Sequence, residues 1–328
     1  MLHESHAAHP SRREWLGQTA AATALLAIGA TAGAEDAKPA QLPIIDTHQH
    51  LWDLDKFTLP WLAKDGPISK NFVTADYLKA VAGLNVVKAV YMEVDVADDQ
   101  KVAEAEYVLK LCDDPKNLTV AAVIGGKPAS DGFKDYVAKF KDEPRIKGMR
   151  QVLNGAKPGE MLEKPFVRGV QTLGEFNKSF DICTQPALLA DAVKLVDACP
   201  DTRFILDHCG NGPVAAFRRN SLPNPEVASY RRDLAELAKR DRVICKISGI
   251  AVQLEKKDWG IESLAPVINL CLDTFGPDRV IFASDWPVCL LGASLKDWIN
   301  GLKAIVSNRP VAEQKKLFHD NAVKHYKL

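Results

Sequence analysis

The chain has 328 residues, 47% of them hydrophobic and 26% charged, which is enough apolar material for a sizeable globular core. Lys and Arg together number 42 and so do Asp and Glu, so no net charge would attract nucleic acid or an anionic membrane. We therefore expect neither of these partners and look for a small-molecule ligand.

The N-terminal stretch SRREWLGQTAAATALLAIGATAGA is typical of an export signal. Arg12 and Arg13 precede a weakly hydrophobic run that ends at Ala32-Gly33-Ala34, which is the order of regions in a twin-arginine signal. The run is shorter than the roughly 20 residues that span a bilayer. An uncleaved anchor or an unstructured tail is the alternative. We predict a periplasmic protein without membrane contact after cleavage, with a signal at 1–34, a linker at 35–42 and one catalytic domain at 43–328.

The seven cysteines are scattered and show no C-x-x-C spacing. Cys183, Cys209 and Cys245 lie in or just after apolar runs, where a cysteine is most often a small buried hydrophobic residue. We therefore predict reduced thiols rather than a disulfide scaffold.

One pattern recurs along the remaining chain: an amphipathic helical stretch, a break at Pro, Gly or Asp, and an apolar run that ends on polar residues. This alternation is typical of a parallel sheet covered by helices. It predicts strands at Ile44–His48, Ala89–Val94, Val120–Ile124, Ile146–Val152, Phe180–Thr184, Phe204–Asp207, Val243–Ile247 and Val280–Ala283.

Eight such units in a chain of this length favour a (β/α)8 TIM barrel, an α/β fold of typically about 250 residues. A doubly wound open sheet is the competing fold, but no G-x-G-x-x-G follows the first strand. Because TIM-barrel active sites lie at the C-terminal ends of the strands, the polar residues at those ends are the candidates for function.

His48 and His50 end the first predicted strand in IIDTHQHLWD. Side chains two apart on a strand share a face, so both imidazoles can point into the barrel mouth, as in many metal sites. Alone, an H-x-H pair is a weak signal. The chain after the signal has only three other histidines, however, and one of these, His208 in FILDHCGNG, also ends a predicted strand.

Asp285 in VIFASDWP ends the last predicted strand. A helix cap or turn aspartate is the plain alternative. In a closed barrel the eighth strand lies beside the first, so Asp285 can face the histidine pair, where it would ligate a metal ion or accept a proton from water.

Other polar residues at strand ends are candidates for substrate contact: Glu93, Arg150, Gln185 and Lys246. The long segment after the first strand contains Trp52, Phe57 and Trp61, which either stack on a ring of the substrate or pin the segment to the barrel top.

From about Pro43 to Tyr326 the chain resembles the metal-dependent amidohydrolase superfamily, in the branch that contains sugar lactonases and 2-pyrone-4,6-dicarboxylate lactonase. The matching stretches are IIDTHQHLWD, IKGMRQVL, LDHCG, KISG, FASDWPV and NAVKHY. The resemblance implies that His48 and His50 are the first-strand pair, His208 the sixth-strand histidine and Asp285 the catalytic base, with Arg150 on the substrate.

The chain departs from better-known amidohydrolases at two strands. Met149-Arg150 stands where a bridging lysine is expected, and Asp181 and Cys183 stand where a histidine is expected. The resemblance therefore implies at most one divalent ion, zinc first, on His48, His50 and Asp285. Some lactonases of this branch work without metal, so both forms stay open.

These observations predict a hydrolase that opens a small sugar-type or pyrone-type lactone by water attack, with Asp285 and His208 as catalytic residues. The alternatives are a metal-dependent decarboxylase of the same superfamily and a non-catalytic ligand-binding barrel. The sequence assigns neither the particular lactone nor an oligomeric state.

The export signal is directly testable. We expect the mature protein recovered from the periplasm to begin near Glu35, as read by N-terminal sequencing. Replacing both Arg12 and Arg13 by Lys should leave the protein in the cytoplasm, because the twin-arginine pair is the recognised element. An exported form that retains Met1 would contradict cleavage.

Overall fold

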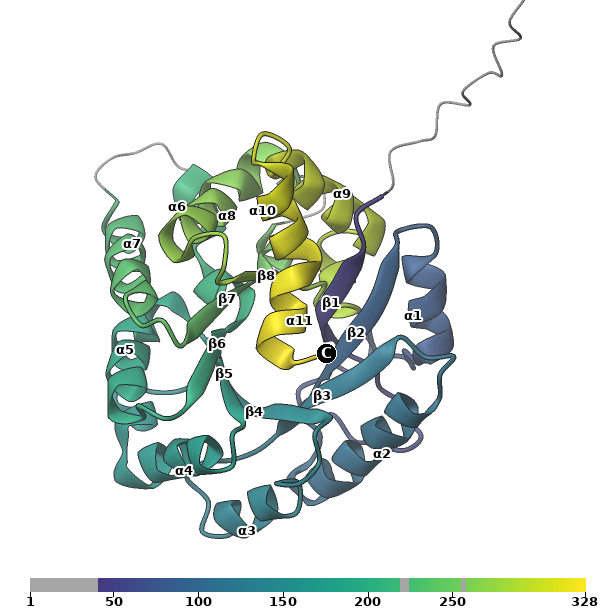
Figure 1. Cartoon of the computed structure of the whole chain (residues 1–328), viewed down its shortest axis with the longest axis vertical. Coiled ribbons are helices and arrows are strands. Elements are labelled where there is room, and N and C mark those ends of the chain that lie inside the picture. The colour runs from purple at the N-terminus through teal and green to yellow at the C-terminus, as the bar shows by residue number, and fades with distance from the viewer. Residues whose placement is uncertain (1–40, 219–223, 255–257) are drawn as a thin grey trace, which may run out of the picture. The chain divides into compact units, whose positions relative to one another are not determined.

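Eight parallel strands with helices between them form a nearly closed barrel in the computed structural model, which describes residues 41–218, 224–254 and 258–328 (Figure 1). The predicted export signal lies outside the described residues. Neighbouring strands pair in chain order, which confirms the predicted (β/α)8 TIM barrel. The strands are β1 (Ile44–Gln49), β2 (Val86–Met92), β3 (Thr119–Gly125), β4 (Ile146–Leu153), β5 (Ser179–Thr184), β6 (Arg203–Leu206), β7 (Val243–Ile247) and β8 (Val280–Phe282).

Most strands differ from the prediction by one to three residues at an end, and two of these differences have identifiable reasons. β2 begins at Val86 rather than Ala89, because its first residues pair with β1 although Val87 is exposed and Lys88 breaks the apolar run. β6 ends before Asp207, where the chain enters a tight turn with left-handed backbone. A pattern of hydrophobic residues detects the buried part of a strand and misses a strand start whose side chains are exposed.

Most helices pack around the outside of the barrel, and the C-terminal ones lie across one end of it (Figure 1). Local sequence explains where several begin. Asn224 caps one helix by accepting hydrogen bonds from the backbone N–H groups of Glu226 and Val227, with Pro225 in the first turn. The helices are α1 (Thr74–Val81), α2 (Lys101–Asp113), α3 (Phe133–Ala138), α4 (Lys164–Glu175), α5 (Leu189–Ala198), α6 (Val214–Arg218), α7 (Pro225–Ala238), α8 (Ile261–Phe275), α9 (Leu295–Ile305), α10 (Val311–Lys315) and α11 (Asn321–Tyr326).

The first and last strands meet through loop backbone more than through paired strands, since β8 has only three residues. The N–H of Asp285 donates to the carbonyl of His48 at 2.9 Å, and the N–H of His50 donates to the carbonyl of Trp286 at 2.7 Å. The buried carboxylate of Asp46 accepts from the N–H of Ser284 at 2.8 Å. These hydrogen bonds form a seam that holds the segment with His48 and His50 in register with the segment that carries Asp285.

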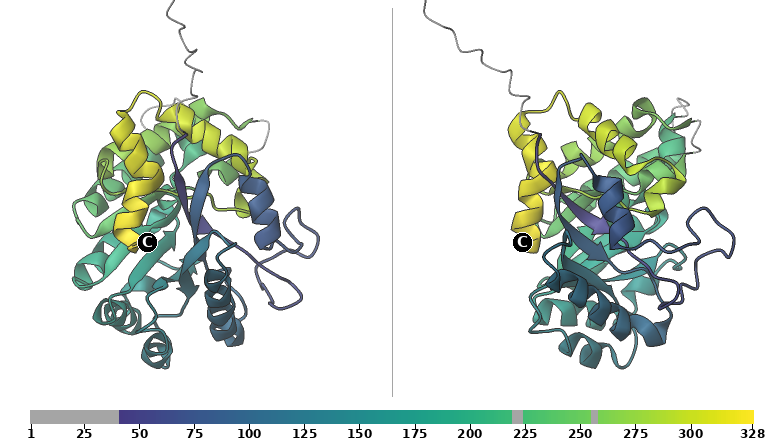
Figure 2. Two further views of the ribbon diagram at one scale, coloured as in Figure 1. Left: turned by 45° about the vertical axis from the view of Figure 1, so that its right-hand side comes forward. Right: turned by 90° about the vertical axis from the view of Figure 1, so that its right-hand side faces the viewer.

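The C-terminal segment closes the end of the barrel at which the strands begin. Tyr326 of α11 packs with apolar side chains of the barrel interior, among them Val90, Ala121 and Ile281. Figure 2 (right) shows α11 at one end of the barrel and the long segment after β1 at the other. The barrel is therefore filled at its N-terminal end and open only at the end that carries the polar residues.

Among the described residues, none of the helices has the length and apolar character needed to cross a membrane.

The seam yields a stability prediction. Asp46 also accepts from the Tyr77 hydroxyl at 2.7 Å and from the N–H of His48 at 3.2 Å, so Asp46→Ala removes the acceptor of three buried donors and should lower the free energy of unfolding by about 3–4 kcal/mol. Tyr77→Phe removes one of these bonds and should cost about 1–2 kcal/mol. Urea unfolding measures both; equal losses would show that the bonds from the N–H groups of Ser284 and His48 contribute nothing.

Candidate active site

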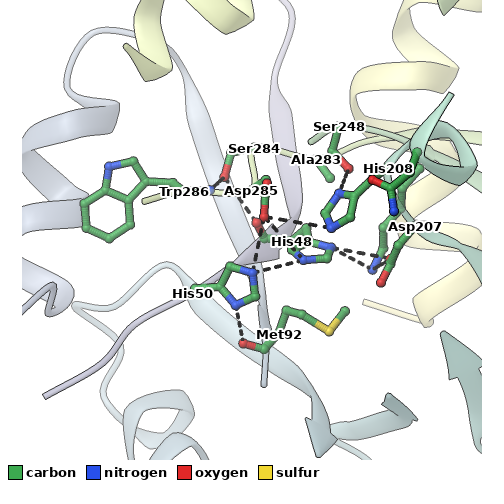
Figure 3. Close-up of polar contacts among 12 residues, drawn as sticks. His48, His50, Met92, Asp207, His208, Ser248, Ala283, Ser284, Asp285 and Trp286 are labelled. Carbon is green, nitrogen blue, oxygen red and sulfur yellow. Dashed lines mark hydrogen bonds and ion pairs between the residues drawn. The ribbon is translucent and has the colours of Figure 1, made fainter. Parts of the chain in front are cut away.

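The four residues expected to form the centre come together at the barrel mouth (Figure 3). His48 Nε2 lies 3.1 Å from His50 Nε2, and these two nitrogens lie 3.7 and 3.3 Å from Asp285 Oδ1. His208 Nε2 approaches the same carboxylate oxygen to 4.0 Å. One carboxylate therefore faces three imidazoles. All four residues are buried, so bulk water has little access to them.

The second nitrogen of each imidazole faces different partners: a carbonyl at His50, a hydroxyl at His208, and both a carboxylate and the Lys246 ammonium at His48. Of these, the carbonyl by itself decides which nitrogen carries the proton. His50 Nδ1 lies 3.0 Å from the Met92 carbonyl, which can only accept a hydrogen bond. His208 Nδ1 lies 3.0 Å from Ser248 Oγ, and His48 Nδ1 lies 3.5 Å from Asp207 Oδ1. With the protons on Nδ1, all three Nε2 lone pairs point at the centre, which is the arrangement that ligating histidines adopt.

Burial keeps two of these imidazoles neutral. It lowers the pKa of His48 well below its usual value, although the neighbouring Asp207 carboxylate acts in the opposite direction. It also lowers the pKa of His208, against the attraction of Asp285. Neutral imidazoles retain the lone pairs that a metal ion or a proton needs.

The backbone is left-handed at two of the four residues, with φ of 55° at His208 and 58° at Asp285. Such backbone is uncommon in residues other than glycine and clusters at functional sites. Gly249 makes the position of His208 possible, because a Cβ atom there would lie 2.3 Å from His208 Nδ1.

Arg150 reaches the centre from β4 and is fixed by Glu93 at the end of β2. Its Nε donates to Glu93 Oε1 at 2.6 Å and its Nη2 to the Glu93 carbonyl at 2.8 Å, while Nη1 lies 3.2 Å from His48 Nε2. The other oxygen of Glu93 accepts from the N–H of Asp95 at 2.7 Å. Glu93, expected to contact substrate, therefore orients Arg150 instead.

Lys246 differs from the prediction more strongly. Its side chain is fully buried, and its Nζ lies 2.7 Å from Asp181 Oδ2 and 3.1 Å from Asp207 Oδ1. Although burial opposes the charge, these two carboxylates raise the pKa of Lys246 above its usual value. Lys246 lies beneath His48 and is not among the residues that line the cavity, so it is not placed to orient a substrate.

A cavity of about 340 Å³ opens above the centre. His50, Arg150, His208 and Asp285 line its floor, and Val94, Val152 and Val252 contribute apolar wall. Its remaining polar lining comes from Asp95, Asn154 and Asn211. The size falls at the lower end of the range of about 300–1,000 Å³ for small-molecule sites, which suits a single ring.

The segment after β1 contributes Trp61 to the cavity and buries Trp52 behind it. Trp52 Nε1 donates to the Lys70 carbonyl at 2.7 Å, and its ring packs edge-on against Phe72 and Trp61. Trp52 therefore pins the segment to the barrel. Trp61 is 43% exposed and lines the cavity, so it is the aromatic residue available for stacking. Gln185, also expected to contact substrate, is exposed and lies outside the cavity lining.

Sequence reasoning missed Asp207, Asn154 and Asn211 as members of the site. Asp207 directly precedes His208 and could have been found as the polar residue that directly follows β6. The two asparagines lie in loops, where Asn211 Nδ2 donates to the Thr184 carbonyl at 2.8 Å and to Asn154 Oδ1 at 3.3 Å. No spacing in the sequence indicates that pairing.

Comparison with known proteins shows the family of this chain. The family model described as Amidohydrolase matches residues 45–328. The chain belongs to the amidohydrolase family. An L-fucono-1,5-lactonase of Burkholderia multivorans is 28% identical over 87% of this chain and 96% of its own length. An L-rhamnono-gamma-lactonase of Scheffersomyces stipitis is 22% identical over 87% of this chain and 98% of its own length.

Solved structures of amidohydrolases share the fold. An amidohydrolase of Burkholderia multivorans, crystallised with bound HEPES, matches 87% of this chain and 99% of its own with a TM-score of 0.76 at 25% identity. A second crystal form of an amidohydrolase from this species contains bound zinc and also has a TM-score of 0.76 at 24% identity. The fold extends to a 2,6-dihydroxybenzoate decarboxylase of Rhizobium, with a TM-score of 0.58 at 13% identity over 87% of this chain and 98% of that one.

Gly249 allows a test of the centre. Gly249→Ala should displace the His208 imidazole and lower hydrolytic turnover by about 10²-fold, because small misplacements at a reacting centre are costly. Gly276→Ala is the matched control, since Gly276 shares the positive φ but has open space around its Cβ position. Crystal structures of both variants check the displacement; an unmoved imidazole in Gly249→Ala would contradict it.

Proposed function

We propose that this amidohydrolase opens a small, uncharged sugar-type lactone by general-base hydrolysis, and that it does so in the periplasm. One observation carries the proposal: the Asp285 carboxylate faces three imidazoles at the floor of a cavity sized for one ring. The lactonase relatives support the reaction class, and the twin-arginine pattern supports the location.

Asp285 is the group that takes the proton. Its side-chain contacts in the described structure are with the imidazoles, so no structural donor occupies the carboxylate. A water between Asp285 and the substrate would lose its proton to the carboxylate as its oxygen bonds to the lactone carbonyl carbon. The ring C–O bond then breaks, and Asp285 returns the proton to the departing alkoxide, so the product is the open hydroxy acid.

Arg150 stabilises the negative charge that develops on the carbonyl oxygen. It lines the cavity floor and is fixed by Glu93 before substrate binds, so little reorganisation is needed during the reaction. Asn154 and Asn211 offer amide groups to substrate hydroxyls. The ring of Trp61 can cover the apolar face of a sugar ring.

The donor set fits one divalent ion. Nε2 of His48, Nε2 of His50 and Oδ1 of Asp285 lie 3.1–3.7 Å from one another, as the ligands of a tetrahedral zinc ion do, and the Met92 carbonyl accepts the Nδ1 proton of His50 on the far side. A divalent ion there would polarise the carbonyl and increase the acidity of water. The Nη1 group of Arg150 competes with a metal ion for the Nε2 lone pair of His48. In hydrolysis without metal, Arg150 alone stabilises the negative charge on the carbonyl oxygen.

The charges of the cavity favour a neutral substrate. Arg150 is the cation among its lining residues and is already paired with Glu93, and the carboxylate of Asp95 lies 3.6 Å from Lys101, whereas Asp285 faces the imidazoles without a cationic lysine or arginine partner among the described residues. A pyrone dicarboxylate or an aromatic carboxylate would meet the Asp285 carboxylate with no unpaired cation in the lining. This argues for a sugar-type lactone over the pyrone type and over the decarboxylase alternative.

The test is hydrolysis of a panel of neutral aldonolactones alongside a pyrone dicarboxylate and 2,6-dihydroxybenzoate. We expect turnover of at least one aldonolactone, and Asp285→Asn should lower kcat by about 10²–10⁴-fold because the base is lost. Asp95→Asn, on the same cavity but outside the centre, is the control and should change KM more than kcat.

Two outcomes would contradict the proposal. Near-normal turnover by Asp285→Asn would show that another group is the base, and release of CO₂ from 2,6-dihydroxybenzoate without lactone opening would establish the decarboxylase. Rates of chelator-treated enzyme with and without added zinc separate the metal-bound and metal-free forms.

A further inference from the structure

A second group of potential metal ligands lies directly beneath the centre. His48, Asp207 and His208 have donor atoms within 4.8 Å of one another, and all three residues are buried. Both oxygens of Asp207 lack a well-formed hydrogen bond, although they are fully buried. Buried carboxylates require a cation, so the question is what supplies it here.

The Lys246 ammonium already occupies this position. Its Nζ lies 3.1 Å from Asp207 Oδ1 and 3.5 Å from His48 Nδ1, and it donates to Asp181 Oδ2 at 2.7 Å. Its side chain is fully buried, with the ring of Tyr326 at 5.9 Å on the closed side of the barrel. The ammonium is therefore enclosed by two carboxylates, an imidazole and an aromatic ring.

We propose that Lys246 serves as a built-in substitute for a second metal ion. Its ammonium supplies the positive charge that Asp181 and Asp207 need beneath His48, and its methylene stem fills the space that an ion and its ligand shell would take. The centre above it can therefore hold one divalent ion at most. Lys246 is a positioning residue, because it acts on the centre through Asp207 and His48.

This role explains why the lysine is placed where no substrate reaches it. Arg150 approaches the other oxygen of Asp207 at 3.6 Å, so Asp207 lies between two cations and its buried charge is compensated. Asp207 can therefore stay ionised and accept a hydrogen bond from Nδ1 of His48. The Nε2 lone pair of His48 is left facing Arg150 and His50 at the centre.

Removing the ammonium and its stem should open a real metal site. In Lys246→Ala, Asp181 and Asp207 face each other across an empty space, and carboxylates suit Zn²⁺ and Mn²⁺. We expect this variant to unfold at a lower temperature than wild type when metal-free. With added ZnCl₂ it should bind about one more equivalent than wild type and regain thermal stability, because an ion that binds only the native state stabilises it.

Two variants are matched controls. Lys246→Met keeps the volume but not the charge, so it should be destabilised and bind no additional zinc. Lys178 is another buried lysine, but its Nζ donates to the backbone carbonyls of Glu143 and Ile146 at 2.9 and 2.8 Å, so Lys178→Ala should lose stability without recovery by zinc. Thermal unfolding and metal content after dialysis are the readouts for all variants.

An equal number of zinc equivalents in Lys246→Ala and wild type, with no zinc-dependent recovery of stability, would overturn the proposal. So would a Lys246→Ala protein that fails to fold with zinc present while Lys246→Met folds. Loss of the additional equivalent in Lys246→Ala/Asp207→Asn would place it at this position; its retention would place the ion elsewhere and overturn the assignment. These readouts do not use lactone hydrolysis, so this inference and the proposed function can fail separately.

Discussion

The barrel interior buries cationic and anionic side chains next to one another, at a depth where an isolated charge would cost several kcal/mol. Lys246 compensates Asp181 and Asp207, and Arg150 compensates Glu93. Because these residues lie in, or directly after, five different strands, the charges are matched only when the barrel is closed in the correct register. These paired charges also contact the histidines at the mouth, since Asp207 and Arg150 face opposite nitrogens of His48.

The side chains inside the barrel thus change in polarity from its N-terminal end to its mouth. Tyr326 and the apolar side chains of the strand starts exclude water from its N-terminal end, and the matched charges lie above them. Neutral imidazoles follow, and the cavity lies at the top. This order lets the protein use strong electrostatic interactions at the centre, because each charged group is oriented before substrate arrives and water competes little with it.

Closing the barrel also positions Asp285, the proposed base. The short β8 and the backbone bonds that link His48, His50, Asp285 and Trp286 turn Asp285 inward in a left-handed conformation. The carboxylate that would be expected to cap a turn is thereby left without a structural donor and faces the imidazoles. His208 is held similarly, in left-handed backbone that packs against Gly249.

The sequence by itself determined the alternation of strands and helices, and with it the barrel, because buried parallel strands need near-continuous apolar runs. It also located His48, His50, His208 and Asp285, since strand ends are visible as the points where those runs stop. Only the tertiary structure decided which polar residues reach the cavity. Lys246, Glu93 and Trp52 lie at strand ends or in the long segment, as predicted, yet they are buried against partners distant in sequence, whereas Trp61, Asn154 and Asn211 line the cavity. A side chain's partner across a closed barrel depends on register and strand tilt, and no local pattern in the chain encodes these.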